Sequence, residues 1–230
     1  MRTGATLSAA AESSGTPSPT FSIERMLGTN PIAVAIPAGN EPAFVADFAT
    51  TTAANGKLEI LQRKNAAAPT GWIQTKDGGP STDANELKKG GSLLPLGGDR
   101  EHSSHKGYAL GAIVDIFSAV LSGANYGPWV PPFPAYVPMP ENLPGQGIGH
   151  FFGAMRIDAF RTAEAFKQHM DNWITRFRQA KTVKGEEKVI IPGDPEREME
   201  AIRMKEGIPL VNVGVEDLKK LGEAFSLSFV

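Results

Sequence analysis

The chain has 230 residues, of which 41% are hydrophobic and 21% charged, values typical of a soluble globular protein long enough to bury a core. The formal net charge is −2 at pH 7 and the basic residues do not cluster, which disfavours a nucleic-acid-binding surface. The absence of cysteine excludes disulfides, thiolate catalysis and cysteine-ligated metals.

The first twenty residues are mostly Ala, Ser, Thr, Gly and Pro, and they lack the apolar run of a secretory signal. We expect residues 1–20 to form a disordered or atypical leader. The longest apolar run, Tyr108–Leu121, contains Asp115 and is short for a bilayer span. These observations favour a cytoplasmic protein without membrane contact.

Two strands are predicted early in the chain, at Pro31–Ile36 and Phe44–Ala49, because both runs are rich in apolar residues. Lys57–Leu61 either continues the sheet or belongs to a helix that crosses from Thr51, and the pattern leaves both open. Residues Asn65–Gly91 are rich in Gly, Pro, Asp and Lys, which predicts a long loop of the kind that often carries function.

A buried helix is predicted over Gly107–Gly123, because its apolar residues cover more than one face. Pro128–Pro144 is proline-rich and aromatic, so it predicts an ordered loop that either packs on the surface or covers a substrate. A strand follows at Phe151–Ile157. An amphipathic helix is predicted over Asp158–Lys181, with Asp158 as its N-cap.

The C-terminal part continues the α/β alternation. We expect a strand at Lys188–Ile191 and then a helix that Asp194 caps and Gly207 ends. A last strand is predicted at Leu210–Val213 and a last helix at Glu216–Phe225. The alternation as a whole predicts the α/β class.

Three segments could carry chemistry. His105-Lys106-Gly107 precedes the predicted helix, where helix N–H groups and a lysine suit a phosphate or carboxylate, although an exposed lysine beside a helix end gives the same pattern. Asp47–Ala53 ends a predicted strand with three threonines, whose hydroxyls either bind a ribose or pyrophosphate or satisfy their own backbone. Pro192-Gly193-Asp194 offers an acidic group for ribose hydroxyls, or simply a helix cap.

Several known motifs are missing from the sequence. No GxGxxG follows a predicted strand, and the chain has neither a GxxxxGK[ST] loop nor HExxH. His102 and His105 are three residues apart, but no third ligand at suitable spacing completes a metal site. We therefore expect no metal.

An ordered set of short motifs resembles the type-2 malate/L-lactate dehydrogenase family, which also contains ureidoglycolate dehydrogenase, diketogulonate reductase, sulfolactate dehydrogenase and a cyclic imino-acid reductase. The matching stretches are Leu27–Pro31, Phe44–Thr51, Gly56–Lys57, Leu94–Gly98, His105–Tyr108, Val114–Asp115, Leu121–Gly123, Gly149–Phe152 and Pro192–Gly193. Lys57 leans away from the imino-acid-reducing members, and Gly97–His105 looks closest to malate/lactate members.

This resemblance implies an α/β fold with a mixed β-sheet, NAD(P)-binding domain of non-Rossmann topology, like that of sulfolactate dehydrogenase. The cofactor domain would span residues 21–157, and a C-terminal helical and αβ segment, 158–230, would pack on it. It also implies a homodimer or higher homo-oligomer. The implied cofactor-binding residues are Asp47, Phe48, Ala49, Thr50, Thr51, Thr52, Ala53, His105, Lys106, Pro192, Gly193 and Asp194, and Thr29 would touch the substrate.

One departure concerns the catalytic residues, which stay unknown. Members of the family carry a catalytic histidine and a carboxylate-binding arginine before Gly-Thr-Asn-Pro, and the leader of this chain resembles neither. The chain's four histidines also fall outside the family's catalytic position; they are His102, His105, His150 and His169. We expect hydride transfer between NAD or NADP and a small 2-hydroxy acid, malate or L-lactate first. The alternatives are a non-catalytic paralogue that dimerises or binds, and a chain completed by a second polypeptide.

Overall fold

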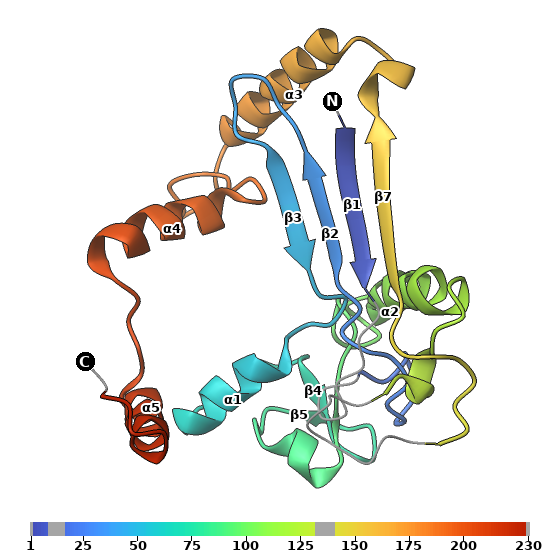
Figure 1. Ribbon diagram of the computed structural model, residues 1–230, viewed down its shortest axis with the longest axis vertical. Coiled ribbons are helices and arrows are strands. Elements are labelled where there is room, and N and C mark those ends of the chain that lie inside the picture. Colours follow the sequence, from blue (N-terminus) through green and yellow to red (C-terminus); the bar gives the residue numbers. More distant parts are fainter. Residues whose placement is uncertain (1, 9–16, 132–140, 229–230) are drawn as a thin grey trace. The chain divides into compact units, whose positions relative to one another are not determined.

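The computed structural model describes residues 2–8, 17–131 and 141–228 (Figure 1). The chain forms two compact units, Met1–Val189 and Ile190–Val230. Residue 157, the expected end of the cofactor domain, lies inside the first of these units. Among the described residues, no helix is long and apolar enough to cross a membrane.

The larger sheet of the first unit has four antiparallel strands. In spatial order they are β3 (Phe44–Phe48), β2 (Ile32–Ile36), β1 (Arg2–Ser8) and β7 (His150–Arg156). The strands expected from the early apolar runs and from residues 151–157 are confirmed as β2, β3 and β7. The α/β class and the non-Rossmann strand order are also confirmed. Among the described residues, the one parallel pairing is the isolated bridge between Pro17 and Leu93.

The leader is not disordered where the structure describes it. Residues 2–8 form β1, and Gly4 pairs with Ala35 of β2 on one side and Ala154 of β7 on the other. Ser18 is buried, and its backbone N–H donates to the carbonyl of Leu93 at 3.3 Å. The composition is misleading here because two neighbouring strands satisfy the backbone of a central strand, whatever its side chains.

A second, small sheet forms inside the segment that we expected to be a loop. Its antiparallel strands run in the order β5 (Pro80–Ser81), β4 (Ile73–Gln74) and β6 (Ser92–Leu93), with a 3₁₀ turn at Glu86–Lys89. Helix α1 (Asn55–Arg63) packs beside it, so the helical alternative for residues 57–61 is confirmed. One apolar cluster joins them: Ala53, Leu58, Ala68, Ile73, Leu87 and Leu93. This region therefore has a core of its own.

Helix α2 (Ser104–Asp115) continues into a π-helical segment, Ile116–Val120. We expected this helix to be buried on most sides, and that expectation is wrong. Val114 and Ala119 are buried, but an apolar face is at least 43% exposed: Ile113, Ile116, Phe117, Val120 and Leu121. The sequence pattern predicts which side chains are apolar, but it does not show whether a partner covers them.

The proline-rich segment is described only at its two ends. A 3₁₀ turn covers Gly127–Trp129, and residues 132–140 lie outside the described part of the chain. After β7, a second 3₁₀ turn occupies Ile157–Ala159.

Helix α3 (Ala163–Arg178) begins later than expected. Its N-cap is Thr162, whose hydroxyl accepts from the backbone N–H of Ala165 at 3.3 Å. The expected cap, Asp158, lies in the preceding 3₁₀ turn and accepts two hydrogen bonds from the guanidinium of Arg156, at 2.9 and 2.8 Å. The Asp158 carboxylate therefore pairs with Arg156 and does not cap α3.

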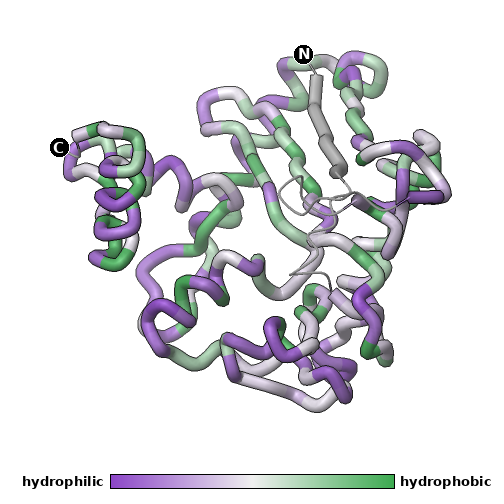
Figure 2. Tube along the Cα trace, turned by 60° about the horizontal axis from the view of Figure 1, so that its bottom comes forward, coloured by the Kyte–Doolittle hydropathy of each residue, from purple (hydrophilic) through white to green (hydrophobic). Residues whose placement is uncertain are grey.

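The second unit consists of two helices, α4 (Asp194–Glu206) and α5 (Asn212–Ala224). Gly207 ends α4, as expected. The strands predicted at residues 188–191 and 210–213 are wrong: the first has no regular structure, and the second runs into α5. A strand needs a neighbour for its backbone groups, and two helices offer none. Figure 2 shows hydrophobic and hydrophilic residues alternating along α5.

Candidate functional site

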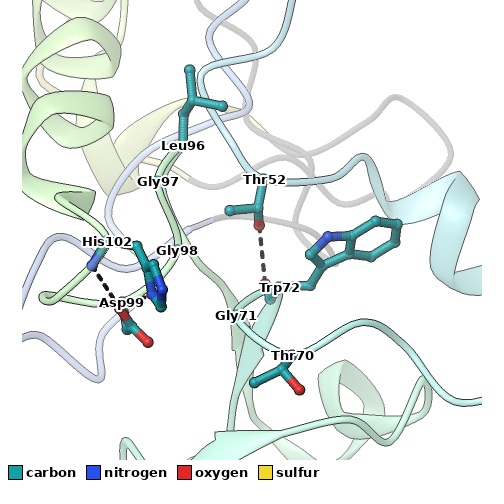
Figure 3. A pocket seen from close by; sticks show the side chains of 9 residues that line it. All are labelled: Thr52, Thr70, Gly71, Trp72, Leu96, Gly97, Gly98, Asp99 and His102. Atoms are coloured by element: carbon teal, nitrogen blue, oxygen red, sulfur yellow. Dashed lines mark hydrogen bonds and ion pairs between the residues drawn. The ribbon is translucent and has the colours of Figure 1, made fainter. Parts of the chain in front are cut away.

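A pocket of about 470 Å³ opens between the loops that surround the small sheet (Figure 3). It is lined by Thr52, Thr70, Gly71, Trp72, Leu96, Gly97, Gly98, Asp99 and His102. Figure 3 shows the pair Asp99 and His102 on one side and the Trp72 indole on the other, with Thr52 and Thr70 between them. Trp72 packs against the core cluster, so its side of the pocket is supported by packed side chains.

The threonines after β3 differ in what their hydroxyls do. Thr50 is buried, and its hydroxyl donates to the carbonyls of Thr29 and Asn30, both at 3.1 Å. The buried Thr51 hydroxyl donates to the carbonyl of Ala53 at 2.8 Å. Thr52 lines the pocket and donates to the carbonyls of Leu94 and Trp72, at 3.1 and 3.3 Å. All three hydroxyls therefore donate to backbone carbonyls, and of the three threonines Thr52 is the one that also lines the pocket.

Glycines let the backbone close tightly around this pocket. Gly97 and Gly98 have φ of +101° and +83°, a region that favours glycine. A Cβ on Gly98 would meet the carbonyl of Gly71 at 2.9 Å, and a Cβ on Gly107 would collide with the backbone of Leu96. Helix α2 is therefore locked against the loop that forms one wall.

Asp99 and His102 form a positioned pair at the pocket wall. The carboxylate of Asp99 accepts from the backbone N–H of His102 at 2.9 Å and contacts its Nδ1 at 2.6 Å. These bonds, the backbone one first, hold the pKa of Asp99 below its ordinary value. Since an ionised carboxylate only accepts, Nδ1 carries a proton in this pair.

A second cavity of about 540 Å³ adjoins the first, because Gly98 and Asp99 line both. Its walls include Phe21, Arg100 and Ser104. Together the two cavities offer room for a ligand longer than either one.

His105 and Lys106 lie in the first turn of α2, rather than before it, and both are exposed. Ser103 at the N-cap has φ of +71° and makes no side-chain cap, while its carbonyl accepts from the N–H of Lys106 at 2.9 Å. The lining of the two cavities reaches His102 and Ser104, directly beside this turn. The structure therefore brings the basic turn next to the cavities.

Other residues expected around the cofactor and substrate are not among those that line the pocket. Asp47 and Phe48 are exposed on β3, and Ala53 belongs to the core cluster. Thr29 is half-buried, and its carbonyl accepts from the backbone N–H of Thr50 at 2.9 Å. Of residues 47–53, the pocket lining includes Thr52.

Pro192, Gly193 and Asp194 belong to the second unit. Gly193, with φ of +96°, is the N-cap of α4 and Asp194 its first residue. The Asp194 carboxylate accepts from Arg197 at 2.8 Å and from the backbone N–H of Ile191 at 3.2 Å. The predicted N-cap, Asp194, is therefore the first residue of α4, and the N-cap is Gly193. Asp194 still satisfies a local backbone group, the N–H of Ile191.

Sequence reasoning missed the indole and the carboxylate of the pocket. Trp72 lies in a segment expected to be a loop without periodicity, and Lys57 Nζ sits 5.9 Å from the centre of its ring. Asp99 and His102 are three residues apart directly after Gly97-Gly98, and that spacing was a usable signal. On sequence alone, His102 is considered as a metal ligand and against the family's catalytic histidine, and neither comparison pairs it with Asp99.

The lining suits a flat ring joined to a sugar that carries hydroxyl groups. The indole of Trp72 offers a stacking face. The Thr52 hydroxyl oxygen and the Asp99 carboxylate can each accept a hydrogen bond from a sugar hydroxyl, and the Thr70 hydroxyl can donate or accept. The Lys106 ammonium in the first turn of α2, together with the N–H groups of the helix end, suits phosphate. The residues present therefore fit a nucleotide.

Comparison with known proteins gives one consistent family. The sequence profile described as malate/L-lactate dehydrogenase matches residues 1–219. The malate dehydrogenase of Pyrococcus horikoshii is 35% identical over 206 residues, which are 89% of this chain and 55% of that protein. The malate/(S)-sulfolactate dehydrogenase of Methanothermus fervidus is 36% identical over 202 residues, 88% of this chain and 54% of that one.

Solved structures agree with the sequence matches. Malate dehydrogenase from Entamoeba histolytica superposes with a TM-score of 0.80 at 28% identity, covering 99% of this chain and 62% of that chain. Sulfolactate dehydrogenase from Methanocaldococcus jannaschii gives 0.76 at 29% identity, covering 99% and 60%. The chain spans about half the length of the curated relatives that it matches.

Proposed function

Because the chain belongs to the malate/L-lactate dehydrogenase family, we propose that it forms the cofactor-binding part of an oxidoreductase. The cofactor is NAD or NADP, and the substrate is a small 2-hydroxy acid or its 2-keto acid, malate or L-lactate first. The observation that carries this proposal is the pocket with an indole on one side and the Asp99–His102 pair on the other.

In this proposal each part of the pocket has a role in holding the dinucleotide. The Trp72 indole stacks on one ring of the cofactor. Asp99 and Thr52 accept hydrogen bonds from its sugar hydroxyls. His105 and Lys106 meet the phosphates from the first turn of α2, where the helix end adds a partial positive charge. Pro192–Asp194 stays a proposed cofactor contact and Thr29 a proposed substrate contact.

The bound nicotinamide would supply or accept the hydride. The residues of this chain bind and orient it: the loops locked by Gly97, Gly98 and Gly107 fix the walls, and Asp99 holds a proton on His102 Nδ1. A pre-formed pocket limits the conformational entropy that a ligand must lose on binding.

The experiment is a fluorescence titration of the purified chain with NADH and, separately, NADPH. The variant Trp72→Ala should weaken binding about tenfold, since ring stacking contributes roughly 1–3 kcal/mol. Trp129→Ala is the matched control, because Trp129 lies outside the pocket lining and packs on Tyr126 at 5.4 Å. Equal losses in both variants, or no binding by the wild type, would overturn the proposed site.

A second candidate function is binding without turnover. The chain matches 54–55% of the length of these curated relatives, so turnover is tested separately from cofactor binding. The same preparation is therefore assayed for NADH oxidation with oxaloacetate and pyruvate. Turnover supports the enzyme, and binding without turnover supports a cofactor-binding protein that a second polypeptide completes. In the second case, adding the unmatched part of the Pyrococcus horikoshii protein should restore turnover.

We also propose that the chain self-associates. The exposed apolar face of α2 and its π-helical extension, from Ile113 to Leu121, supports this, because contiguous apolar surface of this kind marks interaction sites. Light scattering of the wild type and of Leu121→Ser tests it. A smaller mass for the variant is expected, and equal masses would place the contact elsewhere.

A further inference from the structure

A third cavity lies between α3 and the β2–β3 hairpin, away from the pocket described above. Its volume is about 380 Å³. It is lined by Ile36, Phe44, Arg161, Phe166, His169, Met170 and Trp173. None of these described residues lines either of the two cavities assigned to the nucleotide. The third cavity is therefore separate from those two.

The aromatic wall of this cavity is held in place. The rings of Phe44 and Trp173 meet edge to face with centroids 5.9 Å apart, and Trp173 stacks on Phe177 at 4.0 Å. The hairpin is tied to α3 by Asp171, whose carboxylate accepts from the backbone N–H of Gly39, Asn40 and Glu41 at 2.8, 2.8 and 3.0 Å. Because helix and hairpin are fixed to each other, the cavity exists before a ligand arrives.

The polar groups of the lining are both basic. Nη1 of Arg161 lies 3.2 Å from Nδ1 of His169. A guanidinium has only donors, so Nδ1 must accept, and the proton of the neutral imidazole is then on Nε2. The described lining contains no carboxylate, and the nearby Asp171 on α3 is engaged by three backbone amides. The cavity thus combines an apolar body with a permanent positive charge and a ring N–H donor.

We propose that this cavity binds a small amphipathic carboxylate, with its aromatic or branched apolar part among the side chains of α3 and β3. The carboxylate meets the guanidinium of Arg161, which suits it in charge and in its fork of N–H groups. His169 Nε2–H supplies a second donor. The volume falls within the range of small-molecule sites, about 300–1,000 Å³.

The test is isothermal titration calorimetry of the full chain with 3-phenylpropionate and with its neutral isostere, 3-phenylpropanamide. We expect the acid to bind about tenfold more tightly than the amide, the preference that one charge-assisted contact gives. Equal affinities, or no heat from either compound at millimolar concentration, would overturn the proposal.

Two variants locate the charge. Arg161→Met should abolish the preference for the acid while leaving amide binding within about twofold. Arg176→Met is the matched control, because Arg176 is an exposed arginine on α3 that does not line the cavity. A preference that survives Arg161→Met, or that falls equally in both variants, contradicts the proposed site.

Self-association is measured in parallel by light scattering, with and without 3-phenylpropionate. An unchanged mass is expected. Dissociation of a dimer by the compound would mean that a second copy of the chain covers this cavity, and the carboxylate proposal would then fail. If Arg161→Met does not fold, the comparison of acid and amide on the wild type still decides.

Discussion

Two regions of the first unit are stabilised in different ways. The pocket lined by Trp72 and Asp99 adjoins a core cluster in which Leu58, Ile73 and Leu93 have 0% exposure. In the four-stranded sheet, by contrast, the side chains of β2 and β3 are half-buried or exposed, and Phe152 of β7 is 71% exposed. The first region is supported by its own packing, whereas the second is held by backbone pairing and by α3. Short strands and loops can thus support a site better than a regular sheet does.

The contrast between the two regions fails if removing a side chain from the core cluster leaves the free energy of unfolding unchanged. Leu58→Ala should lower the free energy of unfolding by about 2–5 kcal/mol, because it removes a fully buried side chain and leaves a cavity. Phe152→Ser in the sheet should change it by no more than about 0.5 kcal/mol. Urea unfolding of both variants checks this. A larger loss from Phe152→Ser would show that the sheet face is covered after all.

Two glycine substitutions in helices sharpen the comparison. Gly107→Ala should cost about 1–3 kcal/mol of unfolding free energy, because the new Cβ would collide with the backbone of Leu96. Gly56→Ala in α1 should instead stabilise by about 0.5–1 kcal/mol, since nothing lies within 4 Å of its Cβ position. Thermal unfolding measures both. Equal and small shifts would mean that α2 can move away from the pocket loop.

The smallest expected effect concerns the tie between α3 and the hairpin. The backbone N–H groups of Asn40 and Glu41, with that of Gly39, hold the pKa of Asp171 below its ordinary value of 3.8. A carboxylate with a lowered folded-state pKa stabilises the fold above the ordinary value, and this contribution is lost as the pH falls through the folded-state pKa. Asp171→Asn should therefore lower the urea midpoint at pH 7 and match the wild type at strongly acidic pH.

The control for that measurement is Asp77→Asn, an exposed loop residue of the same type. Its difference from the wild type should stay small across the pH range. If both variants gave the same pH dependence, the three amide bonds of Asp171 would contribute nothing specific to stability.

Sequence patterns predicted those elements that depend on local chemistry. The apolar runs of β2, β3 and β7 and the punctuation by Gly207 were read correctly, because each signal lies within the element itself. The composition of residues 2–8 does not predict that they form strand β1, because that strand is formed through pairing with β2 and β7. The exposure of Leu121 was likewise hidden, since it depends on what packs against the helix.

The candidate site shows the same division. Lys106 beside a helix start and Thr52 after a strand are predictions from local sequence, and the structure places Thr52 in the pocket lining and Lys106 in the first turn of α2. The sequence does not point to Trp72, because Trp72 and Thr52 are brought together only by folding. In the structure the Thr52 hydroxyl donates to the carbonyl of Trp72. The spacing of Asp99 and His102 was visible, but their joint orientation depends on the glycines beside them.

The tie at Asp171 has a consequence for the order in which the chain folds. Its three hydrogen bonds join residues 130 to 132 positions apart, whereas β2 and β3 are joined by a short turn. A local hairpin can close in microseconds, while contacts of high sequence separation form late. The amides of Gly39, Asn40 and Glu41 should therefore gain protection from deuterium exchange only when α3 docks, making them reporters of the final folding step.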